Sequence, residues 1–466
     1  MKRFITILLC ITLLVTMVTG CGKKVTTDNT NTPANTTVAP TTAATKAPAA
    51  TVTDDASVKT LNLWAFTEEI PGMMAKFKEA NPDFALEIKP TVIATTDGAY
   101  QPALDQALAA GGADAPDIYA AEAAFVLKYT KGDAYQYAAS YKDLGMDVDN
   151  LLKEADIAQY TVDIGTNPDS NLVGLGYQAT GGAFIYRRSI AKDVWGTDDP
   201  ATIKDKIGPG WDKFYAAAAD LKAKGYGIVS GDGDIWHAVE NSSDQGWIVD
   251  GKLYIDPKRE AFLDLSMKLK EKGYYNDTRD WQDAWFADMK DAGAQKIFGF
   301  FGPAWFINYV LANNTQETSG DWAVCESPIG FFWGGTWVLG NKNTKIPASV
   351  GRILKWITLD SSETGLQYLW ANGLLNKAGT KDAVASGTVM KKSDGSVPFL
   401  GGQNMFDVFV PAGKNANGKN LTQYDETINT YWRDQVREYT AGNKTREQAV
   451  ADFKQQVADN LDVVVE

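Results

Sequence analysis

Between residues 61 and 119, short apolar runs alternate with segments of helical periodicity. The first apolar run, LNLWAF, is typical of a buried strand, and the segment after it places Met73, Met74 and Phe77 on one helical face. Predicted strands are 61–66, 84–88 and 116–119, and predicted helices are 71–80 and 101–110. Strands that alternate with helices in this way form βαβ units, so the pattern predicts an α/β fold with a largely parallel sheet.

The same alternation continues far beyond what one sheet can hold. Further strands are predicted at 184–186 and 296–301, and further helices at 211–224 and 350–359. A chain of 466 residues is also too long for one hydrophobic core. We therefore expect two lobes, each built on its own sheet.

The N-terminus has the pattern of an export signal. Lys2 and Arg3 precede an apolar run over 4–18, which is shorter than the roughly 20 residues that cross a bilayer. The run ends in Val-Thr-Gly-Cys, which resembles the lipobox of bacterial lipoproteins. That resemblance implies cleavage after residue 20, acylation (palmitate) of Cys21, and a chain anchored on the extracellular face of the cell membrane. An ordinary signal peptide with a chance cysteine is the alternative.

Residues 21–57 are dominated by Thr, Ala, Pro and Asn, with few large apolar side chains. Such a segment cannot bury enough surface to offset its chain entropy, so the composition predicts a disordered, lipid-anchored linker. The expected arrangement is a folded body held outside a membrane.

Charge, cysteine and histidine content exclude several functions. The formal net charge of −13 argues against nucleic acid and anionic lipid as partners. After removal of residues 1–20, Cys325 is the one cysteine left besides Cys21, so no internal disulfide is possible, and we expect Cys325 in a buried strand. A single histidine, His237, argues against Ser-His-Asp catalysis and histidine-ligated metal.

Four regions of the body share order and spacing with one known family. They are LNLWAFTEEIPGMMAKFKEANPDFALEI, APDIYAAE, LVGLGYQATGGAFIYRRSIAKDVWG, and FGFFGPAWFINYVL followed by WAVCESPIGFFWGGTWVLGNKN. Together they resemble the extracellular sugar-binding proteins of ABC importers, the maltose-binding-protein-like family 1 solute-binding lipoproteins. The chain departs from the family at Pro303-Ala304-Trp305, where the family has tryptophan directly after proline.

The resemblance implies a fold and a mode of action. It implies the two-lobed periplasmic-binding-protein type II fold, with a ligand cleft and a hinge between the lobes. One lobe would comprise 58–178 and 336–382, and the other 179–335 and 383–466. It also implies a monomer without cofactor or enzymatic activity, which binds a neutral sugar and delivers it to the membrane permease subunits of an ABC importer.

A sugar site needs flat aromatic rings for the C–H faces and carboxylates or amides for the hydroxyls. In open α/β sheets such groups gather on loops after strands. The candidate ligand-binding residues are Trp64, Phe66, Glu68, Tyr119, Glu122, Gln178, Thr180, Asp232, Asp234, Trp236, Trp305, Trp333, Gln403 and Asn404. Of these, Trp305 is the foremost candidate for a stacking platform.

Several neighbouring residues are expected to be structural. A calcium loop at Asp232 and Asp234 is rejected because the spacing fails the EF-hand pattern, and no metal site is predicted. Asp117 and Trp337 are interpreted as structural. The helical spacing of Trp281, Trp285 and Trp356 predicts packing residues.

Two other functions remain open from the sequence. An exported carbohydrate-active enzyme would also use an aromatic cleft with paired carboxylates, although no acid and nucleophile pair stands out in the sequence. The same scaffold could instead bind a non-sugar solute: a cation would suit the acidic body, and an anion would need an arginine cluster, for which Arg187 and Arg188 are the candidates.

Overall fold

A computed structural model describes residues 52–466. The predicted signal peptide, Cys21 and the linker up to residue 51 lie outside the described residues. The described part contains two main sheets and a short two-stranded hairpin.

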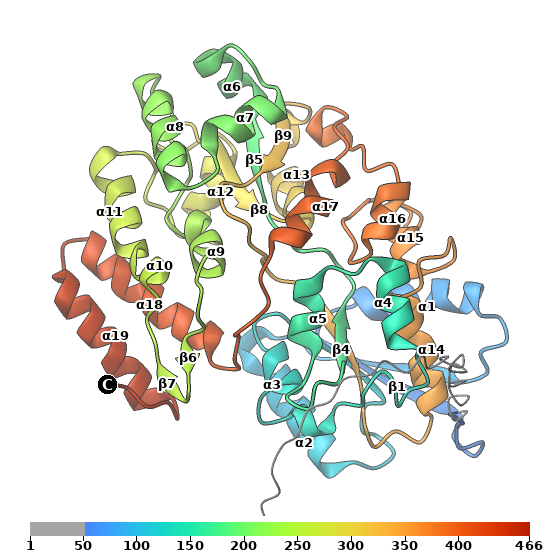
Figure 1. Cartoon of the computed structure of the whole chain (residues 1–466). Coiled ribbons are helices and arrows are strands. Elements are labelled where there is room, and N and C mark those ends of the chain that lie inside the picture. The colour runs from blue at the N-terminus through green and yellow to red at the C-terminus, as the bar shows by residue number, and fades with distance from the viewer. Residues whose placement is uncertain (1–51) are drawn as a thin grey trace, which may run out of the picture. The chain divides into compact units, whose positions relative to one another are not determined.

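The first sheet has five strands in the order β2-β1-β3-β10-β4. Its strands are β1 (Thr60–Ala65), β2 (Glu87–Val92), β3 (Ile118–Glu122), β4 (Gly174–Gly176) and β10 (Thr336–Gly340). Strand β1 runs parallel to β2 and β3, whereas β10 runs antiparallel to β3 and β4. Around it lie α1 (Glu69–Ala80), α2 (Tyr100–Ala110), α3 (Val126–Thr130), α4 (Val148–Ala155), α5 (Gln159–Gly165), α14 (Pro347–Thr358) and α15 (Leu366–Ala371) (Figure 1).

The second sheet has three strands in the order β8-β5-β9. They are β5 (Ala183–Arg187), β8 (Gly299–Gly302) and β9 (Trp322–Glu326), and β5 is antiparallel to both neighbours. The hairpin consists of β6 (Ile248–Val249) and β7 (Lys252–Leu253).

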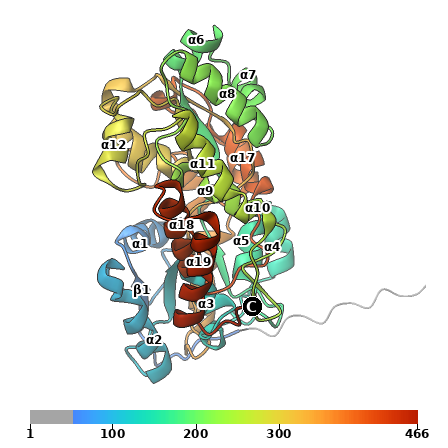
Figure 2. The same cartoon turned by 90° about the vertical axis from the view of Figure 1, so that its left-hand side faces the viewer.

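Helices between and after these strands complete the second half of the body. They are α6 (Arg188–Trp195), α7 (Pro200–Ile207), α8 (Trp211–Ala223), α9 (Gly233–Asn241), α10 (Pro257–Glu260), α11 (Phe262–Lys272), α12 (Asp283–Met289), α13 (Ala312–Asn314), α16 (Gly387–Lys392), α17 (Phe406–Asn415), α18 (Asp425–Thr440) and α19 (Arg446–Asn460). A π-helix spans Phe306–Leu311, and 3₁₀ turns span Thr96–Gly98, Tyr135–Tyr137, Gln316–Thr318 and Pro398–Leu400. The last two long helices, α18 and α19, lie side by side (Figure 2).

The chain passes between the two sheets more than once. It leaves the first sheet after β4, enters the second at β5, and returns to the first between β9 and β10. All strands of the first sheet fall within 58–178 and 336–382, and those of the second within 179–335. The exact lobe boundaries stay a prediction.

The predicted α/β class is confirmed, and the predicted strands and helices are all present in the structure. The strand expected at 84–88 instead begins at Glu87, because Phe84 turns back to pack its ring edge-on against Phe77 at 4.9 Å. The expectation of largely parallel pairing is wrong for the second sheet. Periodicity locates a strand, but its direction depends on how the connecting segment returns to the sheet.

Tryptophan and cysteine side chains of the body form part of the core. As predicted, Cys325 lies buried in β9, and Trp285, Trp337 and Trp356 are buried. Asp117 is structural, also as predicted: its carboxylate accepts hydrogen bonds from the backbone N–H of Asn62 and the hydroxyl of Thr344. These residues stabilise the core around the sheets, so they are not available to bind a ligand.

The chain contacts the folded body before residue 58. The carboxylate of Asp54 accepts hydrogen bonds from the backbone N–H groups of Ala348 and Ser349 at the start of α14, and the N–H of Asp55 donates to the carbonyl of Lys345. A carboxylate at a helix N-terminus satisfies N–H groups that lack an intrahelical partner. Residues 54 and 55 therefore pack against the body, although they fall within the predicted linker.

Gly182, in the segment that links β4 to β5, has no room for a side chain. A Cβ there would lie 2.0 Å from Cζ of the buried Phe331. We expect Gly182→Ala to lower the free energy of unfolding by about 3 kcal/mol, the upper end of the cost of overpacking. Denaturant unfolding measures this change. In the control Gly72→Ala, where α1 leaves open space, we expect a gain of about 0.5 kcal/mol; equal effects of the two substitutions would contradict the close packing.

Candidate ligand-binding site

One cavity of about 520 Å³ is lined by segments from both sheets. Its volume is in the range that small-molecule sites occupy. The lining residues are Phe66, Thr67, Glu69, Glu122, Gln178, Trp281, Trp305, Tyr309, Trp333, Gly334, Gly335 and Thr336.

Strand ends position four of these side chains. Phe66 and Thr67 follow β1, Glu122 is the last residue of β3, and Thr336 is the first residue of β10. The β3–β10 register pairs Glu122 directly with Thr336. Because β1 and β3 are parallel, their carboxyl ends meet at one edge of the sheet, where ligands bind in open α/β folds.

Three tryptophans form the aromatic wall of the cavity. The rings of Trp281 and Trp305 are nearly parallel, at 12° with centroids 6.4 Å apart. The ring of Trp333 stands across both, with centroids 5.8 Å from Trp281 and 5.1 Å from Trp305. The indole N–H of Trp305 donates to the carbonyl of Trp333 at 3.1 Å. Large rings held in this way offer a rigid surface to the apolar faces of a ligand.

Trp281 is the most unusual member of this wall. Its backbone has φ of 64°, a left-handed conformation that is rare for large side chains, and its side chain is 48 % exposed. Strained residues of this kind concentrate at functional sites. The interpretation of Trp281 as a packing residue is wrong, because the turn before α12 directs its ring outward while Trp285 remains in the core.

The loop Gly334-Gly335 brings backbone close to these rings. Both glycines have positive φ, and a Cβ on Gly334 would lie 3.5 Å from Cζ2 of Trp305 and 3.7 Å from Oε1 of Glu122. Thr180 holds the loop, since its hydroxyl donates to the carbonyl of Gly334 at 3.0 Å. Glycine therefore keeps one corner of the cavity open between a carboxylate and an indole ring.

Glu122 is a half-buried carboxylic acid beside the tryptophan wall. Burial raises its pKa to about 7, the nearby carboxylate of Glu426 adds to the rise, and the backbone N–H of Ala124, which donates to Oε2 at 2.8 Å, opposes it. A group with such a pKa binds hydrogen-bond donors strongly when it is ionised.

Glu69 is the second lining carboxylate. Its Oε1 accepts a hydrogen bond from the hydroxyl of Tyr177, and burial raises its pKa although this bond opposes the rise. Asp382 lies behind it, fully buried; burial and the negative charge of Glu69 raise the pKa of Asp382 to about 8. Burial therefore favours the neutral form of Asp382 at neutral pH, and Glu69 is the carboxylate that lines this end of the cavity.

The structure brings five of the predicted binding residues together in this cavity. These are Phe66, Glu122, Gln178, Trp305 and Trp333. The inserted Ala304, itself buried, does not remove the Trp305 ring from the site.

Three other candidates lie close to the cavity but do not line it. Trp64 packs partly buried against the core of the first sheet, and Glu68 is exposed just before α1. Thr180 is buried, and its role is to position the glycine loop.

The remaining predicted residues have structural roles instead. Gln403 uses its whole amide on the backbone of Val324, and Asn404 accepts from the N–H of Phe406. Asp234 accepts from the N–H groups of Ser230 and Gly231 at the start of α9. These side chains are therefore engaged within the protein.

The other predicted binding residues are buried and therefore do not reach the cavity. Tyr119 and Trp236 are in the core, and buried Asp232 lies 3.6 Å from the guanidinium of Arg437. Arg187 pairs with Asp291 and Asp321, and Arg188 pairs with Asp198. Neither arginine is among the residues that line the cavity.

Sequence reasoning missed several lining residues, namely Thr67, Glu69, Trp281, Tyr309, Gly334, Gly335 and Thr336. The segment Phe66-Thr67-Glu68-Glu69 did mark the loop, but not which glutamate turns inward. Tyr309 lies in a π-helix, whose altered spacing directs side chains in a way that helical periodicity does not predict.

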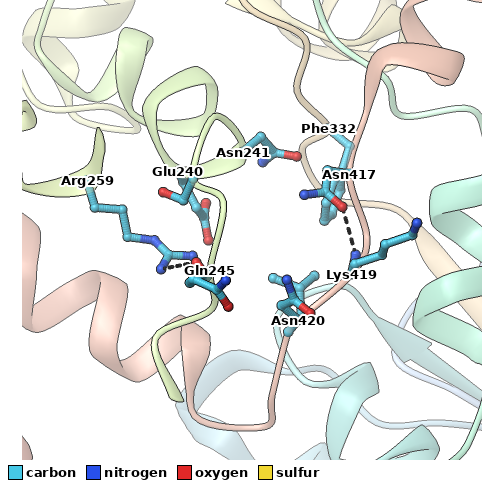
Figure 3. A pocket seen from close by; sticks show the side chains of 10 residues that line it. Glu240, Asn241, Gln245, Arg259, Phe332, Asn417, Lys419 and Asn420 are labelled. Carbon is cyan, nitrogen blue, oxygen red and sulfur yellow. Dashed lines mark hydrogen bonds between the residues drawn. The ribbon is translucent and has the colours of Figure 1, made fainter. Parts of the chain in front are cut away.

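A second cavity, between α9 with the loop after it and residues 417–421, is much smaller (Figure 3). Its volume is about 20 Å³, enough for about one water molecule. Most of the residues that line it are polar, among them Glu240, Asn241 and Arg259. The size is insufficient for a sugar ring.

Within residues 52–466, no group of three or more His, Cys, Asp or Glu side chains is arranged to hold a metal ion. None of the helices described for the same residues combines the length and apolar character that crossing a bilayer requires.

Solved structures with the same fold are numerous. One, described as an extracellular solute-binding protein family 1, has a TM-score of 0.68 and 19 % identity over 85 % of this chain and 99 % of its own. A second is the galacto-N-biose-/lacto-N-biose I-binding protein of the ABC transporter from Bifidobacterium longum, in complex with lacto-N-biose. Its TM-score is 0.65 and its sequence identity 17 %, over 89 % of this chain and 100 % of its own. A third is the sugar-binding protein MalE from Xanthomonas citri, with a TM-score of 0.64 and a sequence identity of 14 %, over 86 % of this chain and 96 % of its own.

At these identities the similarity concerns the fold, and it confirms the predicted two-lobed solute-binding architecture. A search of curated proteins finds no match. A family model described as "Bacterial extracellular solute-binding protein" matches residues 64–364, which is more than half of the chain. The chain belongs to this family of bacterial extracellular solute-binding proteins, as its sequence motifs predicted.

Proposed function

We propose that this protein captures a soluble sugar or oligosaccharide in the cavity between its two sheets and delivers it to the membrane subunits of an ABC importer. The proposal rests on one observation: three tryptophan rings, two carboxylates and an amide line the same cavity. Rings suit the C–H faces of a sugar, and Glu69, Glu122 and Gln178 suit its hydroxyls.

The charge of the lining narrows the choice of ligand. Among the lining residues that the structure describes there are two carboxylates and no Arg, Lys or His. An acidic sugar or a phosphate ester would meet repulsion without a compensating cation. The solved relatives whose descriptions name a sugar ligand are consistent with a carbohydrate.

Hinge closure is the proposed mechanism. Segments near 177–182 and 327–335 link the two sheets, so a change in their backbone would move one sheet relative to the other. A ligand that contacts both halves would shift the population toward a closed form, which the importer would then bind. Acylation at Cys21 and the linker after it would keep the protein at the extracellular face of the membrane, as a monomer.

A thermal-shift screen with mono- and oligosaccharides tests the proposal. A ligand at 100 times its Kd should stabilise the folded form by about 2.7 kcal/mol, because it binds only that form. We expect at least one sugar to raise the Tm, and none of a set of sugar phosphates and uronic acids to do so. A screen in which no sugar raises the Tm would contradict the proposal.

A carbohydrate-active enzyme is the second candidate, and one observation favours it. Glu69 and Glu122 are two carboxylic acids in one aromatic cavity, and glycosidases use a pair of carboxyl groups, of which the general acid has a raised pKa as Glu122 does. Incubation with oligosaccharides followed by an assay for new reducing ends separates the two functions. A binding protein leaves the reducing-end count unchanged, whereas turnover that Glu122→Gln abolishes would establish the enzyme.

A further inference from the structure

Neither carboxyl group in the lining of the cavity has a cationic side chain as a partner. No cationic group contributes to the pKa of Glu69 or of Glu122, and the one charged neighbour that affects Glu122 is the like-charged Glu426. Every lysine, arginine and histidine of the described part is absent from the lining. A carboxylate withdrawn from water is costly unless a cation or several hydrogen-bond donors compensate it.

Glu122 and Trp305 face the same open corner. The position that a Cβ on Gly334 would occupy is 3.7 Å from Oε1 of Glu122, 3.5 Å from Cζ2 of Trp305 and 3.7 Å from its Nε1. The backbone N–H of Ala124 occupies Oε2 of Glu122, so the other oxygen is the one nearer the corner. A small cation in this corner would touch a carboxylate and an indole ring together, the two surfaces that attract ammonium groups most.

We propose that the ligand is an amino sugar, whose protonated amine binds between the carboxylate of Glu122 and the indole of Trp305. The inference rests on the proposed function and deepens it, replacing the neutral sugar expected from the sequence. The hydroxyl of a neutral sugar can donate one hydrogen bond to Glu122 but leaves its charge uncompensated. An ammonium group donates the same bond and supplies the missing charge.

The two glutamates are not equivalent in this respect. Glu69 already accepts a hydrogen bond from Tyr177 and adjoins Asp382, which burial favours in its neutral form. Glu122 accepts hydrogen bonds only from backbone N–H groups, and its Oε1 lies at the corner beside Trp305. The amine is therefore assigned to Glu122, and hydroxyls of the same sugar to Glu69.

Three β-1,4-linked disaccharides that differ only at C2 test the assignment. They are fully deacetylated chitobiose, which carries amines, its di-N-acetyl form, and cellobiose, which carries hydroxyls. Isothermal titration at pH 7 should show that the diamine binds at least about ten-fold more tightly than either neutral form. Glu122→Gln, which keeps the shape and removes the charge, should reduce this preference to about two-fold or less, because hydrogen bonding alone remains. The matched control Glu68→Gln removes a charge from an exposed residue beside the cavity and should preserve the preference.

The other possible results of these titrations overturn either the amino-sugar inference alone or the proposed function as well. If a neutral sugar of the panel binds and the diamine has no advantage, the amino-sugar inference is overturned while the proposed function stands. The inference is also overturned if Glu122→Gln, folded by circular dichroism, keeps the full preference. If none of the three disaccharides binds but a sugar without an amine raises the Tm in the thermal-shift screen, the inference is overturned and the proposed function stands. If no sugar in that screen raises the Tm, both the inference and the proposed function fail.

Discussion

Trp305→Ala is expected to abolish sugar binding and leave the protein folded. The ring is part of the tryptophan wall, 5.1 Å from Trp333 and nearly parallel to Trp281. Removing a central aromatic ring from a binding site costs about 2–4 kcal/mol, which corresponds to about 30- to 1000-fold in Kd. The substitution also releases the carbonyl of Trp333 from the indole N–H, so the wall itself loosens.

Two measurements together check this result. Titration of the intrinsic tryptophan fluorescence with the best sugar of the panel should show a saturable change for the unmodified protein and none for Trp305→Ala. Circular dichroism should show a cooperative unfolding transition for both, because the Trp305 side chain is only partly buried. Tyr254→Ala removes another exposed ring, outside the cavity, and should bind the sugar normally. A variant that keeps wild-type affinity would show that the ligand binds elsewhere.

Asp382→Asn should stabilise the protein, and more so as the pH rises. Asp382 is 1 % exposed; its Oδ1 accepts from the N–H of Ala383 at 2.8 Å, and its Oδ2 has no hydrogen-bond partner. Burial, together with the charge of Glu69, raises its pKa to about 8 in the folded protein, whereas an unfolded chain has a value of about 3.9. Between these values the folded state binds more protons than the unfolded state, so stability falls as the pH rises from about 4 to about 8.

Asparagine is neutral at every pH and removes this dependence. The stability difference between Asp382→Asn and the unmodified protein should therefore grow with pH, with a slope of at most about 1.4 kcal/mol per unit. Urea unfolding at pH 5, 6.5 and 8 measures the slope. Asp114→Asn is the matched control, since that side chain is 98 % exposed and should show no such trend. A variant that is less stable than the unmodified protein at pH 8 would mean that the buried carboxylate is ionised and favourably paired.

The local sequence pattern was sufficient to predict the strands and helices and the fold class. Strand β1, helix α1 and helix α8 lie within two residues of the positions that periodicity predicts, because a buried face must repeat at the period of its own element. The motifs around APDIYAAE and the glycine-rich segment before β10 also identified the family, which the family model confirms.

Which residues line the cavity depended on the tertiary structure. Glu122 and Thr336 are far apart in the chain, and the antiparallel pairing of β3 with β10 places them side by side. Gln403 looked like a free amide in a polar turn, yet its amide binds the backbone of Val324 in the neighbouring strand β9. No local pattern carries this information, since it depends on which strand packs beside which.

The pattern of residues along the chain was enough to predict the alternation of strands and helices, the division into more than one sheet, and the aromatic and acidic character of the site. Which of two adjacent glutamates turns inward, and whether Trp281 joins the core or the cavity, was decided only in three dimensions. The physical reason is that periodicity reports the burial of a repeating face. A ligand site is instead assembled by loops, whose side chains are directed by single backbone angles such as the positive φ of Trp281 and Gly334.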